Sequence, residues 1–213
     1  MKTLTMKFGG TSVANVDRIK AVRDIISGEV RNGWKVVAVV SAMSNETNKL
    51  IDLAKRVGVE SLVDPEYDSL ISTGEDVSSS LLAIALNSIG ISSRSWRGWQ
   101  LPVITNNFHS NARIEEIDTR KIVDAFNGGT KVAVISGFQG IEQSGRITTL
   151  GRGGSDTSAV AIAAAIDAKR CDIYTDVSGI YTTDPRIKKN ASKLKKISFE
   201  EMLEMASLGA NVL

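Results

Sequence analysis

The stretch "KVVAVV", residues 35–40, carries valine or alanine at every position after its lysine. A strand with one solvent-exposed face alternates apolar and polar residues. An uninterrupted apolar run therefore predicts a strand that is buried on both faces. Such strands are typical of parallel sheets that are covered by helices on both sides. Gly33 precedes the run and Ser41 follows it, which favours turns at both ends. The stretch therefore predicts the interior of an α/β sheet.

Strand and helix patterns alternate outward from this run. Residues 4–8 and 131–136 predict further strands, and residues 12–27 carry apolar residues at helical spacing. Other strands are predicted at residues 93–96, 102–105 and 172–175, a hairpin at 141–149, and helices at 47–57, 68–88, 118–126 and 198–207, with an alanine-rich helix beginning at Ser155 or Asp156. The alternation predicts one domain over residues 1–213, a three-layer αβα sandwich with a mainly parallel central sheet.

Composition limits the partners of this fold. The chain has 213 residues, with 26 basic and 24 acidic side chains and a formal net charge of +2, so we expect no nucleic-acid partner. The apolar runs are too short to span a bilayer, so we expect no membrane partner. With Cys171 as the only cysteine and no signal-peptide pattern, we expect a cytoplasmic protein.

Ligands of parallel α/β sheets bind beyond the carboxyl ends of the strands, so the first strand-to-helix junction, "KFGGTSV" (residues 7–13), is a candidate site. Lys7 is a cation at the end of a strand, Gly9 and Gly10 free the backbone, and Thr11 or Ser12 can cap the next helix. An anion site suited to nucleotide phosphates is one interpretation. A solvent-facing lysine on an edge strand is the other.

The stretch "TTLGRGGSDTSA", residues 148–159, resembles a second anion cradle. The glycines let a ligand approach the main chain, Arg152 offers a planar fork for a carboxylate or phosphate, and Ser155 or Asp156 can cap the helix. A surface turn with a solvated arginine is equally compatible with the pattern. No P-loop or dinucleotide fingerprint is present.

Two more stretches carry polar groups suited to ligands. In "STGE" (residues 72–75), a glycine inside a helical pattern suggests a bend or a close approach, and Glu75 is either an ammonium partner or an exposed helix carboxylate. Residues 174–186, "YTDVSGIYTTDPR", offer rings, hydroxyls and an arginine for a nucleotide, or simply an Asp-Pro turn. His109 is the only histidine, which excludes a His-based triad and leaves no zinc cluster, so no protein metal site is predicted.

The order of these motifs is more specific than any one of them. KFGGTSV, SAM (residues 41–43), STGE, GFQG (137–140), LGRGGSDTSA and IYTDVSGIYTTDPR together resemble the aspartate kinases, a branch of the amino acid kinases, over essentially the whole chain. The resemblance implies phosphorylation of the side-chain carboxylate of L-aspartate by ATP, with Mg²⁺ on the nucleotide, at the entry to lysine, threonine and methionine synthesis. The side-chain carboxyl of aspartate, with a pKa of about 3.9, is already an anion at neutral pH, so the reaction needs no general base.

The resemblance also implies roles for single residues. Lys7 and Asp156 are the implied catalytic residues, with Asp156 orienting the lysine. The implied aspartate contacts are Ser41, Thr47, Glu75, Arg152, Gly153, Gly154 and Ser155, with Glu75 on the amino group and Arg152 on the α-carboxylate. The implied ATP contacts are Lys7, Phe8, Gly9, Gly10, Tyr174, Thr175, Asp176, Tyr181, Thr182, Asp184, Arg186 and Asn211.

The chain departs from the family pattern near residue 213. Asn211 stands where the family has a phosphate-contacting lysine, and we expect a C-terminally incomplete kinase domain without the regulatory domains. We expect a homo-oligomer or association with a regulatory segment. Two alternatives stay open: a catalytically impaired nucleotide- and aspartate-binding subunit of a longer kinase, and a kinase of the acetylglutamate type.

Overall fold

The computed structural model describes residues 2–59, 63–176, 179–183, 188 and 190–207. The chain divides into two compact units, Met1–Tyr174 and Thr175–Leu213. The expectation of one domain over residues 1–213 stays a prediction.

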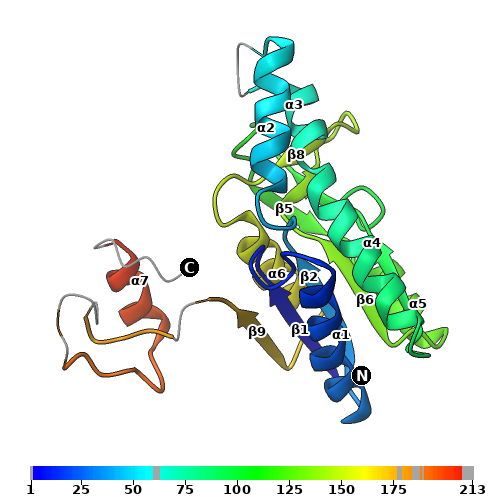
Figure 1. The fold of residues 1–213 in the computed structure, drawn as a ribbon, viewed down its shortest axis with the longest axis vertical. Coiled ribbons are helices and arrows are strands. Elements are labelled where there is room, and N and C mark those ends of the chain that lie inside the picture. Colours follow the sequence, from blue (N-terminus) through cyan, green and yellow to red (C-terminus); the bar gives the residue numbers. More distant parts are fainter. Residues whose placement is uncertain (1, 60–62, 177–178, 184–187, 189, 208–213) are drawn as a thin grey trace. The chain divides into compact units, whose positions relative to one another are not determined.

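The first unit alternates strands and helices over most of its length (Figure 1). Its elements are β1 (Thr3–Phe8), α1 (Val16–Arg31), β2 (Lys35–Val40), α2 (Glu46–Val57), α3 (Pro65–Ile71), α4 (Thr73–Asn87), β3 (Ser93–Trp96), β4 (Val103–Thr105), β5 (Ile114–Ile117), α5 (Arg120–Asn127), β6 (Val132–Ser136), β7 (Gln139–Ile141), β8 (Ile147–Thr149), α6 (Gly154–Ala165) and β9 (Arg170–Tyr174). The described residues of the second unit include α7 (Phe199–Ser207) and an antiparallel bridge between Tyr181 and Lys193.

The described strands form two sheets, of which the larger is parallel throughout. Its order is β3-β6-β2-β1-β9, and β2 lies between β6 and β1, as the valine run predicts. The smaller sheet has the order β5-β4-β7-β8, with the β7–β8 pair forming the expected hairpin. The strand predicted at residues 102–105 is β4, but the sequence did not predict β5 or a separate second sheet, because strands of three or four residues are too short to show a period.

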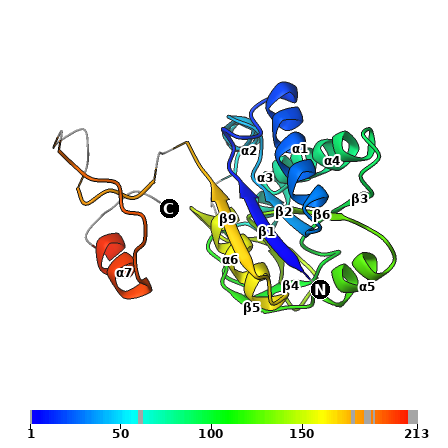
Figure 2. The same cartoon turned by 90° about the horizontal axis from the view of Figure 1, so that it is seen from below.

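Side chains of β2 alternate between two cores. Val36, Ala38 and Val40 belong to the core that includes side chains of α1 and α4. Val37 and Val39 belong to the core that includes side chains of α5 and α6. Figure 2 shows α1 and α4 on one side of the sheet and α6 on the other. The three-layer αβα sandwich is therefore confirmed.

The helix predicted over residues 68–88 is two helices. α3 ends at Ile71 and α4 begins at Thr73, with Ser72 as the junction. The close approach expected at the STGE glycine is confirmed, since a Cβ on Gly74 would lie 2.8 Å from the Cβ of Ala42. The missing side chain allows the start of α4 to lie against the loop that follows β2.

Three helices begin differently from the prediction. α1 is capped by Asn15, whose Oδ1 accepts from the Arg18 N–H at 3.0 Å, so neither Thr11 nor Ser12 is the cap. α2 begins at Glu46, one residue before the predicted start at residue 47, and Asn45 precedes it. α5 begins at Arg120, two residues after the predicted start at residue 118, and Asp118 accepts from the Arg120 N–H at 3.0 Å.

The alanine-rich helix also begins differently from the prediction. Its N-cap is Gly153, with φ of +72°, and no side chain caps it. Ser155 and Asp156 lie in the first turn of α6 instead, because a glycine in the left-handed region turns the chain into the helix before them. Both side chains are therefore available for other contacts.

Candidate functional site

The carboxyl ends of the central strands meet at one edge of the large sheet. Phe8 at the end of β1 pairs with Val40 of β2 and with Tyr174 of β9. The backbone then continues the register, since the Ser41 N–H donates to the Phe8 carbonyl at 3.1 Å and the Gly137 N–H donates to the Val40 carbonyl at 3.0 Å. The junctions predicted from sequence thus lie side by side.

Lys7 and Asp156 meet at this edge. The Lys7 Nζ lies 2.8 Å from Asp156 Oδ1, although the two residues belong to β1 and to the first turn of α6. The two side chains form a close ion pair. Lys7 is only 7% exposed. The interpretation of Lys7 as a solvent-facing edge lysine is therefore wrong, because β1 lies inside the sheet.

The glycine turn after β1 brings the backbone close to this lysine and to the loop after β2. A Cβ on Gly9 would lie 3.4 Å from the Lys7 Nζ, and a Cβ on Gly10 would lie 3.0 Å from the Ala42 carbonyl oxygen. The Ser12 and Val13 N–H groups both bond the Gly9 carbonyl, which closes the turn. A buried cation beside bare backbone suits the oxygens of a phosphate group.

Glu75 is a buried carboxylate, not an exposed helix residue. It is 4% exposed, and its Oε1 accepts from the Ala42 N–H at 3.0 Å. Among the described residues, Oε2 has no hydrogen-bond partner. Burial is the main cause that raises the pKa of Glu75 to about 8; the Ala42 hydrogen bond opposes this shift, and the adjacent Asp76 carboxylate adds to it. A ligand that brings an ammonium group to Oε2 would satisfy this oxygen.

Two other predicted aspartate contacts lie near Glu75 in the fold. Ser41 is half-buried directly after β2. Thr47 is half-buried in the first turn of α2. The start of this helix adjoins the start of α4, since a Cβ on Gly74 would lie 3.9 Å from the Glu46 Cβ.

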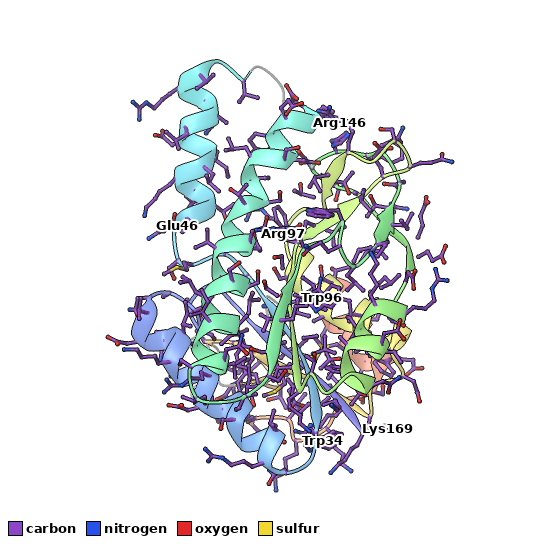
Figure 3. All side chains as sticks on the ribbon, turned by 90° about the vertical axis from the view of Figure 1, so that its right-hand side faces the viewer. Trp34, Glu46, Trp96, Arg97, Arg146 and Lys169 are labelled. Carbon is purple, nitrogen blue, oxygen red and sulfur yellow. The ribbon has the colours of Figure 1, made fainter. Side chains whose placement is uncertain are left out.

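Asp76 forms a polar network next to Glu75 that the sequence did not reveal. Its Oδ2 lies 3.1 Å from the Arg97 Nε, and its Oδ1 accepts from the Ser136 Oγ at 2.8 Å and the Gln139 Nε2 at 3.2 Å. Figure 3 shows Arg97 directly after Trp96, the last residue of β3. GFQG was noted as a motif, but nothing in the sequence relates Gln139 to an acid 63 residues away.

The N-terminus of α6 packs closely on the end of β6. A Cβ on Gly137 would lie 2.9 Å from the Ser155 Oγ, and a Cβ on Gly154 would lie 2.9 Å from the Phe138 ring. Arg152 and Gly153 are exposed immediately before the helix. The tight packing fixes the helix start, and it leaves the Arg152 guanidinium accessible to a ligand.

The predicted ATP contacts fall on both units. Tyr174 ends β9 and its ring stacks on Phe8, with centroids 4.6 Å apart. In the second unit, the Thr175 Oγ1 donates to Asp176 at 3.4 Å, and the Thr182 N–H donates to the Ser192 carbonyl at 2.9 Å. The ATP contacts predicted from residue 175 onward, Tyr181 included, stay predictions, and Asp184, Arg186 and Asn211 lie outside the described residues.

The described residues contain neither a metal-binding cluster nor a membrane-spanning helix. No cluster of three or more His, Cys, Asp or Glu side chains that could hold a metal ion occurs among them. Within the same residues, no helix has the length and apolar character needed to span a membrane.

Comparison with known proteins places this geometry in a family. The model of the amino acid kinase family matches residues 2–213. The aspartokinase of Bacillus sp. (strain MGA3) is 53% identical over 213 residues, covering 100% of this chain and 51% of that protein. The aspartate kinase of Pseudomonas fluorescens (strain SBW25) is 52% identical, covering 100% of this chain and 52% of that protein. The chain thus spans about half the length of the curated relatives it matches.

Solved structures agree with the sequence comparison. The crystal structure of aspartate kinase from Synechocystis has a TM-score of 0.83 and 46% identity, covering 99% of this chain and 34% of that one. E. coli aspartokinase III in complex with aspartate and ADP has a TM-score of 0.83 and 28% identity, covering 97% of this chain and 56% of that one. With its motifs, its sheet order and these relatives in agreement, the chain belongs to the amino acid kinase family.

Proposed function

We propose that this chain forms the aspartate- and phosphate-binding part of an aspartate kinase. The reaction transfers the γ-phosphoryl group of ATP to the side-chain carboxylate of L-aspartate, and it yields 4-phospho-L-aspartate and ADP. The observation that carries the proposal is the buried Glu75, whose Oε2 has no hydrogen-bond partner among the described residues, at the edge where Lys7 also lies. E. coli aspartokinase III, a structural relative, was solved with aspartate and ADP, which supports this choice of ligands.

In this proposal Glu75 and Arg152 bind the two charged groups on the α-carbon of aspartate. The ammonium group donates to Glu75 Oε2, which favours the ionised carboxylate and lowers its pKa from about 8. The exposed Arg152 binds the α-carboxylate in the forked geometry that guanidinium groups favour, with the backbone of Gly153 and Gly154 and the side chain of Ser155 beside it. Ser41 and Thr47 line the remaining wall.

Lys7 and the glycine turn serve the phosphoryl group. The ammonium of Lys7 balances charge that develops on the transferring group, and Asp156 holds the lysine in place from 2.8 Å. Gly9 and Gly10 carry no side chain that would keep phosphate oxygens away from the backbone. Mg²⁺, carried by the ATP phosphates, would add further positive charge when bound.

The chemistry needs positioning and charge balance more than proton transfer. The attacking carboxylate is an anion at neutral pH, and the phosphoryl group is also negatively charged. The cations Lys7 and Arg152 therefore reduce the repulsion between the two reactants while the binding site aligns them. Neither role involves proton transfer, so no histidine base is needed.

The state of the Glu75 carboxylate also bears on the acetylglutamate alternative. An N-acetylated amino group is a neutral amide and carries no ammonium for Glu75 Oε2. With such a ligand the Glu75 carboxyl, whose pKa of about 8 is not lowered, stays protonated and gains no ion pair. Glu75 therefore favours a substrate with a free α-amino group, and we propose L-aspartate over N-acetyl-L-glutamate.

Trapping of the acyl phosphate tests the proposal. The chain is incubated with MgATP, L-aspartate and hydroxylamine, and the hydroxamate is measured. We expect product with L-aspartate and not with N-acetyl-L-glutamate, with a loss of roughly 10²-fold or more in Glu75→Gln. Glu115→Gln, which neutralises an exposed carboxylate, is the matched control and should keep the parent rate. Absence of hydroxamate from a folded parent chain that also fails to bind L-aspartate would refute the proposal.

A further inference from the structure

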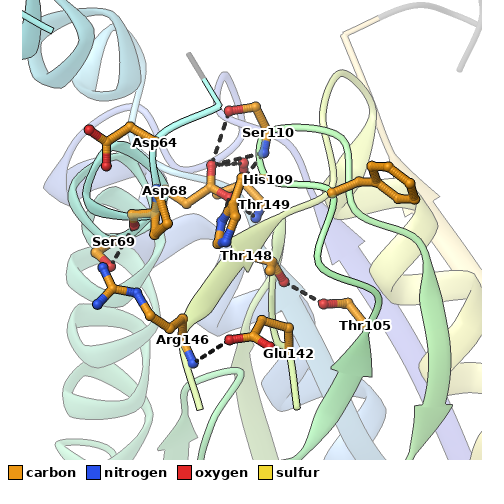
Figure 4. A network of polar contacts seen from close by, with 12 residues as sticks. Asp64, Asp68, Ser69, Thr105, His109, Ser110, Glu142, Arg146, Thr148 and Thr149 are labelled. Carbon is orange, nitrogen blue, oxygen red and sulfur yellow. Dashed lines mark hydrogen bonds and ion pairs between the residues drawn. The ribbon is translucent and has the colours of Figure 1, made fainter. Parts of the chain in front are cut away.

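Asp68 is a fully buried carboxylate outside the groups assigned above. It lies in α3 and is 0% exposed. Its oxygens accept from the Thr149 N–H at 3.0 Å, the Thr149 Oγ1 at 2.7 Å and the Ser110 N–H at 3.0 Å, and its Oδ2 lies 2.9 Å from the His109 Nδ1 (Figure 4). Because protein donors surround both oxygens, Asp68 is not a ligand group itself. It joins three segments to one another: α3, the loop at residues 109–110 and the end of β8.

One of these segments leads directly to Glu75. The Ser72 N–H donates to the Asp68 carbonyl at 3.1 Å, and α4 begins at the next residue, Thr73. Glu75 lies in the first turn of α4. Through Ser72, the position of Asp68 therefore affects the position of Glu75, the proposed ammonium-binding residue.

The second segment leads to Arg152. Thr149 is the last residue of β8, and Arg152 follows three residues later. The Leu150 N–H donates to the Phe138 carbonyl at 2.9 Å, so the chain stays ordered beyond Thr149. Asp68 therefore anchors the strand end from which the Arg152 turn departs.

The third segment supports the same turn from the other side. Asp68 holds Ser110, and a Cβ on Gly151 would lie 3.3 Å from the Ser110 carbonyl oxygen and 3.0 Å from the Asn111 Oδ1. Gly151 has φ of +75° and immediately precedes Arg152. The Ala112 N–H also donates to the Thr149 carbonyl at 2.9 Å, which joins this loop to β8. Two of the three segments thus converge on the residue before Arg152.

We propose that Asp68 is a positioning residue that sets the spacing between Glu75 and Arg152. This inference rests on the proposed function, in which the two residues bind the ammonium and the carboxylate on one α-carbon. The spacing between those two groups is fixed in every α-amino acid, so their binding partners must also be held at a fixed separation. A misplacement of about 1 Å at such a site can cost on the order of 10²-fold in rate. Asp68 should therefore control the affinity for aspartate and not for the nucleotide.

Thr149 offers a matched pair of variants for the test. Thr149→Val keeps the size of the side chain and removes the hydroxyl that donates to Asp68, whereas Thr149→Ser keeps the hydroxyl. We expect Thr149→Val to raise the Kd for L-aspartate by about 10-fold and to leave the Kd for MgATP within about twofold. Thr149→Ser should stay close to the parent in both constants, measured by calorimetry well below the Tm of each variant.

A second measurement needs no ligand. Amide hydrogen exchange across residues 149–154 should be faster in Thr149→Val than in Thr149→Ser, while exchange in α1 stays equal in the two variants. Asp68→Asn turns an amide N–H toward groups that themselves donate, so it should show both effects more strongly wherever it folds. The threonine pair decides the matter if Asp68→Asn does not fold.

Two results would overturn the inference. One is an unchanged Kd for L-aspartate together with unchanged exchange at residues 149–154 in Thr149→Val. The other is an equal rise in both dissociation constants with faster exchange throughout the chain, which is what general destabilisation predicts. If the parent chain does not bind L-aspartate, the proposed function fails, and the exchange comparison still decides whether Asp68 holds the Arg152 turn.

Discussion

Glu75 determines how the site depends on pH. Burial raises its pKa to about 8, so ionisation of this carboxyl opposes folding of the ligand-free chain. The protonated form is favoured in the fold, and the stability associated with it is complete below the ordinary pKa of 4.5. That stability falls as the pH rises from the ordinary value through about 8.

Glu75→Gln should therefore stabilise the ligand-free chain in a pH-dependent way. Glutamine keeps a carbonyl oxygen for the Ala42 N–H and cannot ionise. We expect its free energy of unfolding to exceed that of the parent by about 2 kcal/mol or more at pH 8, with a much smaller gain near pH 5. Urea denaturation at both pH values measures this difference, with Glu115→Gln as the control. An equal difference at the two pH values would show that Glu75 does not titrate in this range.

Lys7 should act mainly on turnover. Lys7→Met removes the cation that lies 2.8 Å from Asp156 and keeps most of the apolar side chain. We expect kcat to fall by roughly 10²–10³-fold, with a smaller change in the Kd for L-aspartate, because a charge that matters during phosphoryl movement is felt mainly in the transition state. The assay is the trapped acyl phosphate at saturating substrates.

Lys35→Met is the matched control for Lys7. Lys35 is the first residue of β2, so it lies at the amino edge of the parallel sheet, whereas Lys7 lies near the carboxyl edge. The Lys35 Nζ donates to the carbonyls of Phe126 and Thr130. The control variant should lose stability and keep kcat per folded molecule. A Lys7 variant with kcat close to the parent would leave this lysine with a structural role only.

Individual residues show where prediction from sequence reaches its limit. Lys7 and Glu75 were identified because they belong to short motifs in a specific order. Asp68 and Asp76 were missed because their partners are distant in sequence. The side-chain partners of Asp68 lie 41 to 81 residues away. Those of Asp76 lie 60 or more residues away, apart from the nearer Arg97. Contacts over such separations leave no local pattern. The burial of Glu75 was equally invisible, because it depends on the loop after β2.

At the scale of elements, Gly74 allows α4 to reach the end of β2. Gly74→Ala would place a Cβ 2.8 Å from the Ala42 Cβ, so either the helix or the loop must move. We expect a loss of about 1–3 kcal/mol in the free energy of unfolding and a weaker affinity for L-aspartate, because Glu75 follows directly. Thermal denaturation and calorimetric titration measure the two effects.

Gly28→Ala provides the matched control in another helix. Gly28 lies in α1, and a Cβ there would meet nothing within 4 Å. Alanine should raise the free energy of unfolding by about 0.4–1 kcal/mol and leave the affinity for L-aspartate unchanged. If both variants changed stability in the same direction and by the same amount, the close approach at Gly74 would not matter.

Strands were predicted better than helix starts. The buried strands β2 and β6 are recognisable from their apolar runs, because both faces of the sheet are covered, whereas β1 alternates polar and apolar residues although it is buried along its whole length. The start of α6 was misplaced because it depends on the left-handed backbone of Gly153 rather than on a capping side chain. Residues that can cap are common in sequences, and only the backbone path decides which of them does.

At the scale of the whole chain, the parallel order of the sheet creates the site. Parallel strands direct all their carboxyl ends to one edge, so residues 7, 41 and 174 become neighbours although they are far apart in sequence. The chain covers about half the length of its curated relatives, and these residues all belong to the unit Met1–Tyr174. The aspartate-binding groups that we propose therefore lie within one compact unit.

A comparison of L-aspartate with succinate tests the central claim, that Glu75 binds the ammonium group of the substrate, most directly. Succinate keeps both carboxylates of aspartate and lacks the amino group, so it leaves Glu75 Oε2 without a partner. Calorimetric titration of the chain should show L-aspartate binding at least roughly 10²-fold more tightly than succinate, and Glu75→Gln should abolish most of this preference. Equal affinities of the parent for the two ligands, or a preference that survives in Glu75→Gln, would contradict the claim.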